Sequence, residues 1–211
     1  HSGAMLVQNK FLVKEGRNQE ALTALNGMVR DFPQWADAHF TKALAHLGLG
    51  ENELALASVG EAIKHNPRNS KYHTTLAFLH LRAQKFEDAK KEAAIALQLQ
   101  PRNFPAALLF ARSVLMAKEY DNAVKILEDM RAKVPNNVEV VGSLGLAYLG
   151  KKEPDKALAA FQEVLKLQPG NTPALVNVAR IQQQQGKKKE EILQLVRDQI
   201  KAAPDSAGNL M

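Results

Sequence analysis

Small apolar residues and helix-breaking residues recur along this chain at a fixed interval of 34 positions. The alanines are Ala21, Ala55, Ala89, Ala123 and Ala157, and the prolines are Pro33, Pro67, Pro101, Pro135 and Pro169. Proline lacks a backbone N–H and clashes with the preceding helical turn, so each proline marks the end of a helix. We therefore expect each unit to hold a helix A, a tight turn and a helix B that ends near the proline. The whole chain should form at least eleven helices and no β-sheet.

The most regular unit carries a recognisable motif. Its helix A contains Leu144-Gly145-x-x-Tyr148, its helix B contains Ala157-x-x-x-Phe161, and Pro169 closes the unit. This pattern and the 34-residue period resemble the tetratricopeptide (TPR) repeat, with Val141 where the usual Trp would stand. The resemblance implies an all-α fold, a TPR solenoid in which antiparallel helix pairs form a right-handed superhelix.

Extending the register along the chain predicts a single array over residues 1–211, with five clear repeats and a degenerate sixth. The repeats are expected at about 2–35, 36–69, 70–103, 104–137, 138–171 and 172–204. In the sixth, Glu191 stands where Ala is due, and Pro204 arrives one residue late. Residues 205–211 resemble the start of a further helix, so we interpret the chain as a fragment of a longer array.

The small residues have a packing role. Helices A and B of one unit cross closely, so a side chain larger than Ala at the contact would push them apart. We expect Ala89 to be buried at such a crossing. Gly16, Gly50 and Gly186 fall at the turn between helices A and B, where a positive φ is often needed.

Composition excludes several classes of function. Lys and Arg exceed Asp and Glu by six, but the basic residues are scattered through all repeats, which argues against a nucleic-acid partner. The chain contains no cysteine, which excludes disulfides and thiolate chemistry. No apolar run approaches the ~20 residues that span a bilayer, so no membrane insertion is expected.

The histidines are the only candidates for chemistry. His39 and His46 lie seven residues apart, and His73 and His80 repeat that spacing one unit later. Seven residues of helix separate two side chains by about 10 Å, too far to share one metal ion. These four stand where the repeat motif places aromatic residues, so we expect them in the packing between helices. Catalytic motifs for hydrolases, zinc proteases and dinucleotide binding are missing, and we predict no enzyme activity, cofactor or metal.

The register predicts which helix A side chains line the concave groove of the solenoid. We list as candidate binding residues Phe40, Leu44, Phe78, Leu81, Leu108, Arg112, Leu115, Met116, Leu146, Leu149, Asn177 and Arg180. Two interpretations stay open: the apolar strip is either an exposed groove or core between repeats. An exposed strip would suit an amphipathic helix or an extended apolar segment, with Arg112 and Arg180 orienting an acidic group.

A second resemblance concerns the setting. The stretches 144–151, 157–161 and 173–181 are similar to the long bacterial TPR proteins of exopolysaccharide export and PEP-CTERM (exosortase) sorting. That resemblance implies an envelope scaffold, with a periplasmic location favoured over a cytoplasmic one.

Two functions compete. The leading hypothesis is a protein–protein interaction scaffold that holds a peptide or helix of a partner, and the alternative is binding of an anionic polymer such as an acidic polysaccharide. Because array ends expose apolar faces, we also expect self-association through residues 5–12 or 192–211.

Overall fold

The computed structural model describes residues 2–203 of the chain. Within that range the chain forms twelve α-helices and no strand. The helices are α1 (Ser2–Lys14), α2 (Asn18–Asp31), α3 (Ala36–Gly48), α4 (Asn52–His65), α5 (Ser70–Arg82), α6 (Phe86–Leu99), α7 (Phe104–Met116), α8 (Tyr120–Lys133), α9 (Val138–Gly150), α10 (Pro154–Leu167), α11 (Thr172–Gln184) and α12 (Lys189–Ala202). The odd-numbered helices are the expected A helices and the even-numbered ones the B helices. The predicted opening of a further helix at 205–211 lies outside the described residues.

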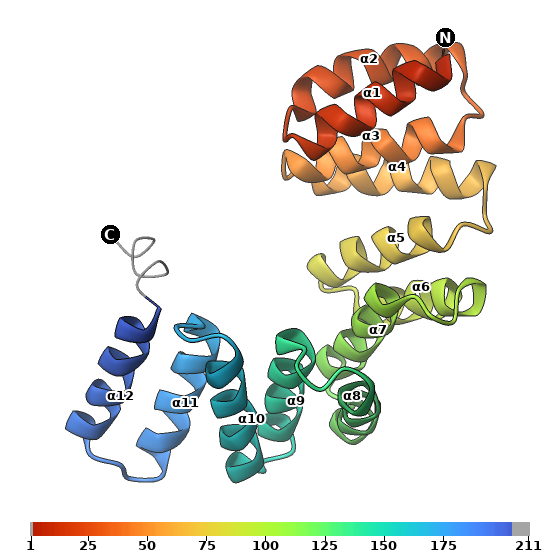
Figure 1. The fold of residues 1–211 in the computed structure, drawn as a ribbon. Helices are drawn as coiled ribbons and strands as arrows, with labels where there is room; N and C mark the ends of the chain where they lie inside the picture. The colour runs from red at the N-terminus through yellow and green to blue at the C-terminus, as the bar shows by residue number, and fades with distance from the viewer. Residues whose placement is uncertain (1, 204–211) are drawn as a thin grey trace. The chain divides into compact units, whose positions relative to one another are not determined.

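The chain divides into two compact units. Unit 1 runs to Ser113 and unit 2 begins at Val114, within helix α7. In unit 1, α1 packs against α2 and α3, α3 against α4, and α5 against α6 (Figure 1). In unit 2, α9 packs against α8 and α10, and α11 against α10 and α12 (Figure 1). The all-α fold of repeated helix pairs is confirmed.

Every periodic proline ends a B helix as predicted. Helices α2, α4, α6, α8 and α10 each end two residues before their proline, at Asp31, His65, Leu99, Lys133 and Leu167. A proline ring disfavours helical backbone in the residue before it, so the helix stops one residue earlier still.

The turn between helices A and B has one backbone conformation throughout. A residue with positive φ, between 58° and 78°, recurs every 34 positions. These residues are Gly16, Gly50, Gln84, Lys118, Lys152 and Gly186. In each turn this residue donates its N–H to a carbonyl three residues earlier, and the next residue donates to the carbonyl five residues before it. This is the Schellman arrangement that satisfies the free carbonyls at a helix end. The three glycines were predicted, and the three longer side chains were not.

Asparagine side chains begin four of the A helices. Asn69, Asn103, Asn137 and Asn171 are spaced by 34, and each accepts a hydrogen bond from a backbone amide in the first turn of the next helix. The same position in α3 is held by Trp35, whose side chain makes no such bond. Asn is among the most effective N-cap residues because its carbonyl oxygen satisfies a free amide.

One of these caps also joins neighbouring repeats. The Oδ1 atom of Asn103 accepts from the Ala106 amide, while its Nδ2 donates to Ser70 Oγ at 2.8 Å and Thr74 Oγ1 at 2.9 Å on α5. Ser70 in turn donates to the Ala96 carbonyl on α6 at 2.8 Å. The start of α7 is therefore tied to the helix pair before it.

Alanines and glycines fill the helix crossings. All five periodic alanines, Ala89 among them, are fully buried. A Cβ atom added at Gly145 would lie 2.9 Å from the Phe161 ring, which is too close for any larger residue without displacement. The predicted requirement for small residues at the contacts is confirmed.

Candidate functional site

The predicted groove residues fall into three classes of exposure. Exposed members are Phe78, Arg112, Met116, Leu146 and Arg180. Half-buried members are Phe40, Leu44, Leu81, Leu149 and Asn177. Leu108 and Leu115 are buried.

The assignment of Leu108 and Leu115 to a binding strip was wrong. They lie seven residues apart on one side of α7, and that side is core, with 5% and 6% of their surfaces exposed. Arg112 and Met116 of the same helix are exposed. The repeat register placed both residues on helix α7. It did not show which side of α7 the neighbouring helices cover.

In unit 1, a polar cluster links three successive A helices. The Tyr72 hydroxyl of α5 donates a hydrogen bond to Asp37 of α3, and Lys10 of α1 lies 3.4 Å from the same carboxylate. The hydrogen bond from Tyr72 is the main cause that lowers the pKa of Asp37, and the charges of Lys10 and Lys71 act in the same direction. Burial and the same bond raise the pKa of Tyr72. Asp37 therefore stays ionised among cations.

Aromatic packing places α3 beside α5. The Phe40 and Tyr72 rings lie 4.6 Å apart between centroids. Phe40 and Leu47 also pack against a buried cluster that includes Ala43 and Leu79. The half-buried groove candidate Phe40 therefore contributes to the core as well as to the surface.

Phe78 is the large apolar side chain that α5 exposes, with 38% of its surface accessible. The Arg82 guanidinium lies 5.7 Å from the centre of its ring. A cation over an aromatic face is a favourable arrangement that also fixes the ring. Phe78 thus presents carbon surface next to a positive charge.

Unit 2 exposes apolar surface on its own A helices. Leu146 of α9 and Val176 of α11 are 44% and 49% exposed. Asn177 uses its side-chain amide to donate to the Pro173 carbonyl at 2.8 Å, so it stabilises the first turns of α11. Arg180 is exposed.

Three of the four predicted histidines, His39, His46 and His73, make local hydrogen bonds. His46 Nδ1 lies 2.6 Å from Glu51 Oε2, and His73 Nδ1 lies 2.7 Å from Glu92 Oε2, with both rings buried. His39 and His73 each bond through Nε2 to a periodic proline carbonyl. Among residues 2–203, no group of three His, Cys, Asp or Glu side chains could hold a metal ion.

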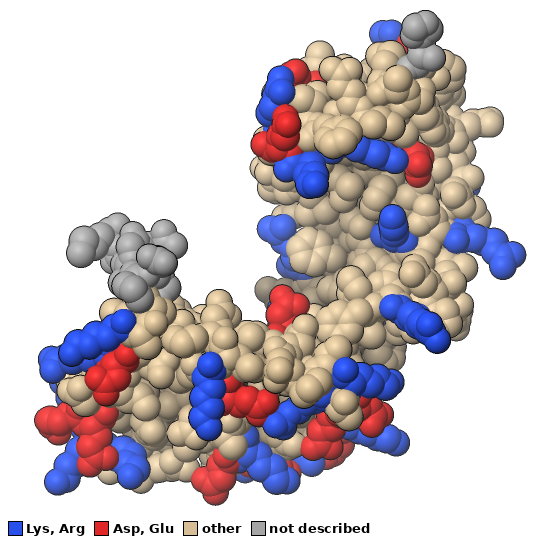
Figure 2. All heavy atoms as spheres, viewed as in Figure 1, with Lys and Arg blue, Asp and Glu red and all other residues tan. Residues whose placement is uncertain are grey.

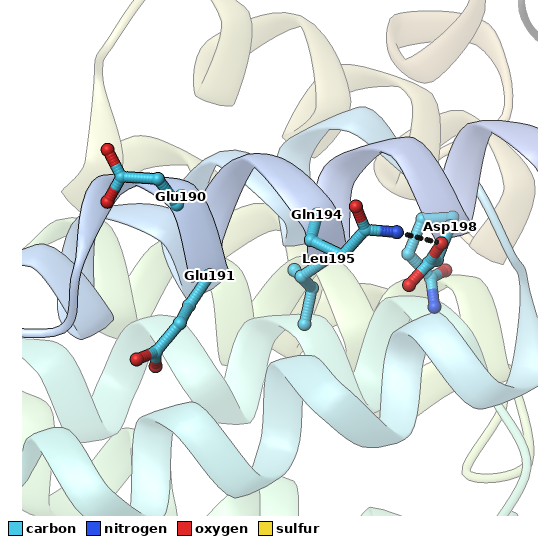
Figure 3. Close-up of a pocket in the computed structure, with 6 residues that line it drawn as sticks. Glu190, Glu191, Gln194, Leu195 and Asp198 are labelled. Atoms are coloured by element: carbon cyan, nitrogen blue, oxygen red, sulfur yellow. Dashed lines mark hydrogen bonds between the residues drawn. The ribbon is translucent and has the colours of Figure 1, made fainter.

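A hollow along α12 was not predicted from the sequence. It is lined by Glu190, Glu191, Gln194, Leu195, Asp198 and Gln199 (Figure 3). Gln194 donates to Asp198 at 2.8 Å, and the two neighbouring glutamates point in different directions (Figure 3). All six lining residues come from this one helix.

The predicted contacts at the array ends stay a prediction. Helix α1 exposes Phe11 at 60%, Val7 at 53% and Met5 at 47%, and α12 exposes Leu193 and Ile200. The part of that prediction that concerns residues 204–211 lies outside the described range.

Sequence reasoning missed one feature of unit 1. Several cations of unit 1 lie on its A helices, among them Lys10, Lys71 and Arg82. By composition alone these cations looked scattered along the chain. Placing each charge in the repeat register would have shown that they share one side of the A helices, as Lys71, Phe78 and Arg82 do at spacings of seven and four.

Comparison with protein families identifies the repeat. Three models of the tetratricopeptide repeat match residues 12–73, 80–146 and 139–171, which together cover most of the chain. The chain belongs to the tetratricopeptide repeat family. TPR proteins generally mediate protein–protein interactions and are typically non-enzymatic scaffolds. The comparison with curated proteins found no match.

Solved TPR structures share the fold at low sequence identity. A tetratricopeptide repeat protein from Parabacteroides merdae ATCC 43184 is 18% identical with a TM-score of 0.73, over 94% of this chain and 84% of that one. YrrB, described as a TPR protein with an unusual peptide-binding site, is 16% identical with a TM-score of 0.71, over 82% and 89%. A MamA fragment (41-end) from Desulfovibrio magneticus RS-1 is 21% identical with a TM-score of 0.69, over 80% and 96%. At these identities the likeness shows the fold alone.

None of the helices within residues 2–203 has the length and apolar character needed to cross a bilayer. The resemblance to exosortase-linked proteins finds no support in the family models or the structural relatives.

Proposed function

We propose that this TPR protein is an interaction scaffold that binds a peptide or helical segment of a partner on the A-helix faces of its units. The observation that carries the proposal is the exposure of Phe78 and Leu146. These residues stand two periods apart at the same position of the repeat, one in each unit, and keep 38% and 44% of their surfaces accessible. Large apolar side chains exposed at a repeated position are the anchors that interfaces use.

The proposal draws further support from a structural relative. YrrB has this fold and is described as having an unusual peptide-binding site. Binding of a partner would remove that carbon surface from water.

Selection from a random peptide library displayed on phage tests the proposal with the full chain as bait. Peptides that bind should lose at least about tenfold in affinity when Phe78 or Leu146 is changed to Asp, because the charge would have to be buried under the bound apolar group. Leu54→Asp is the matched control, since Leu54 is an exposed leucine (51%) on the B helix α4. Circular dichroism should show unchanged helicity in all three variants. Failure to enrich any peptide, or equal loss with Leu54→Asp, would contradict the proposal.

An anionic polymer is the second candidate ligand, and exposed cations in unit 1 favour it. Lys71, Arg82 and Arg112 are all exposed on A helices. Binding of an acidic polysaccharide should weaken steeply between about 50 mM and 200 mM salt, whereas an apolar anchor should be nearly insensitive. Isothermal titration with alginate at both salt concentrations separates the two.

We infer the cellular setting from the sequence resemblance alone. Similarity to the TPR proteins of exopolysaccharide export supports a scaffold in bacterial envelope assembly, with a periplasmic location. Deleting the gene in its own host should then reduce secreted polysaccharide. Unchanged secretion with the protein found in the cytoplasm would refute this setting and leave the binding proposal intact.

A further inference from the structure

The A and B helices of unit 1 differ in charge. In α1, α3, α5 and the part of α7 that belongs to this unit, Asp37 is the only acidic residue. The same helices carry the cations Lys10, Lys14, Lys42, Lys71, Arg82 and Arg112. The face of unit 1 turned to the viewer in Figure 2 shows more Lys and Arg surface than Asp and Glu surface.

Most of these A-helix cations form no ion pair among residues 2–203, whereas three cations of the B helices do. On the B helices, Arg30 pairs with Asp31, Lys64 with Glu61 and Lys90 with Glu87. Within residues 2–203, no acidic side chain forms an ion pair with Lys71, Arg82 or Arg112. Lys10 is the exception, and the acid it meets at 3.4 Å also accepts the Tyr72 hydroxyl.

Four side chains occupy one repeat position on four successive A helices. They are Lys10 on α1, Leu44 on α3, Phe78 on α5 and Arg112 on α7, each 34 residues from the next. Contacts show that the helices follow one another in space: Lys10 reaches Asp37 of α3, and Phe40 of α3 packs on Tyr72 of α5. Asn103, at the start of α7, donates to Ser70 and Thr74 of α5. The row therefore reads cation, apolar, apolar, cation. We call Lys10, Leu44, Phe78 and Arg112, together with Lys71 and Arg82, the basic face of unit 1.

The order of charged and apolar side chains in this row defines which peptide would be complementary to it. Helices α1 and α3 pack directly on each other, and packed helices lie about 8–10 Å apart; α3 and α5 meet through the Phe40 and Tyr72 rings. An extended peptide advances about 3.3 Å per residue, so one peptide residue in three would meet each successive A helix. A complementary segment places an acid opposite Lys10, apolar residues opposite Leu44 and Phe78, and an acid opposite Arg112.

Resting on the proposed function, we propose that the ligand of unit 1 is an extended acidic segment of a protein, with the pattern acid-x-x-apolar-x-x-apolar-x-x-acid. Lys71 and Arg82 flank Phe78 on the same side of α5 and receive further carboxylates. A polyanion without carbon side chains would leave Phe78 and Leu44 uncovered, which favours a protein segment over a polysaccharide.

Three synthetic ten-residue peptides test the proposal by fluorescence anisotropy with the full chain. The first follows Glu-x-x-Leu-x-x-Phe-x-x-Glu with Ser and Gly spacers. The second replaces both Glu by Gln, and the third replaces Leu and Phe by Ser. The first should bind at least about tenfold more tightly than either of the others, because charge pairs and the apolar anchors both contribute.

Charge reversal in the protein provides the matched comparison. Lys10→Glu/Arg112→Glu should weaken the first peptide at least about tenfold, by changing two attractions into repulsions. Lys85→Glu/Lys91→Glu makes the same change in net charge at two exposed residues, Lys85 just before α6 and Lys91 within it. This variant should alter the affinity for the first peptide less than about twofold. Circular dichroism checks that both double variants keep their helicity.

The other outcomes separate this inference from the proposed function. If the Gln peptide binds as tightly as the first peptide, and Phe78→Asp weakens both, the ligand need not be acidic. That result would overturn this inference and leave the interaction scaffold standing. If the Ser peptide binds as tightly as the first peptide, the apolar anchors contribute nothing. That result would overturn this inference in favour of an anionic polymer. If no peptide binds here and no library peptide is enriched, the inference and the proposed function fall together.

Discussion

The turn between helices A and B offers a stability test that compares two neighbouring residues. Gln84 has φ 58°, in the left-handed region, and its neighbour Ala83 has φ −79°. Both are exposed, and the turn is held by backbone bonds from Gln84 to Leu81 and from Lys85 to His80. A glycine at either position keeps those bonds, so the two substitutions differ mainly in the backbone conformation they meet.

The magnitudes follow from the two conformations. A residue with a side chain costs roughly 1–2 kcal/mol in the left-handed region, which glycine avoids. Glycine also loses more backbone entropy on folding, by roughly 0.5–1 kcal/mol. Gln84→Gly should therefore raise the free energy of unfolding by about 0.5–1 kcal/mol. Ala83 has a negative φ, so a glycine there relieves no strain. Ala83→Gly should therefore lower the free energy of unfolding by about 0.5–1 kcal/mol.

Thermal unfolding followed by circular dichroism measures both changes. For a chain of this size, 1 kcal/mol corresponds to roughly 2–4 °C in Tm, so the variants should shift by about 1–4 °C in opposite directions. Gly50→Ala provides the converse: a Cβ there meets no atom within 4 Å, so the loss of Tm should reflect the positive φ of 78° alone. A decrease in Tm for Gln84→Gly as large as that for Ala83→Gly would refute the reasoning.

Substitutions at three further positions test the rest of the structure. Asn137→Ala removes the cap of α9 and should cost about 1 kcal/mol in urea unfolding, whereas Asn137→Asp should retain most of it; equal losses would count against the cap. Ala89→Leu should cost about 1–3 kcal/mol by overpacking, and an unchanged Tm would contradict its position at a helix crossing. Burial and then the Glu128 bond raise the pKa of Tyr148 to about 12, so its contribution to stability is complete below about pH 10 and lost as pH rises through 12. In a phenolate absorbance titration, Tyr148→Phe should remove the absorbance change that occurs near pH 12. Loss of an absorbance change near pH 10 instead would contradict this.

The helices could be predicted because local chemistry determines where they end. Pro67 stops α4 through its own ring, and Ala89 fits where a larger side chain would clash. The left-handed turn was predicted only where glycine signals it. Lys118 and Lys152 adopt the same φ because the repeat geometry requires it, and no local feature of a lysine reveals that. The Asn caps share the 34-residue period and were readable in principle from residues such as Asn137.

The candidate site was less predictable for a physical reason. The register shows which side of a helix a residue occupies, but exposure depends on how far neighbouring helices cover that side. Phe78 and Leu115 are both apolar residues of A helices, yet Phe78 keeps 38% of its surface accessible and Leu115 keeps 6%. The sequence of one repeat does not contain the size and position of the side chains that the next repeat brings against it.

The two roles of Asn103 bear on how the chain folds. Starting a helix is costly because several residues are fixed before the first hydrogen bond forms. At α7 that start is assisted by a side chain whose amide group binds Ser70 and Thr74, so the assistance is complete only once α5 is in place. Nucleation of α7 is thereby coupled to the preceding repeat, and folding of unit 1 should propagate from α5 and α6 into α7. Removing the Asn103 amide should slow the formation of α7 more than the loss of a cap alone would, because it uncouples neighbours in a structure built from nearest-neighbour contacts.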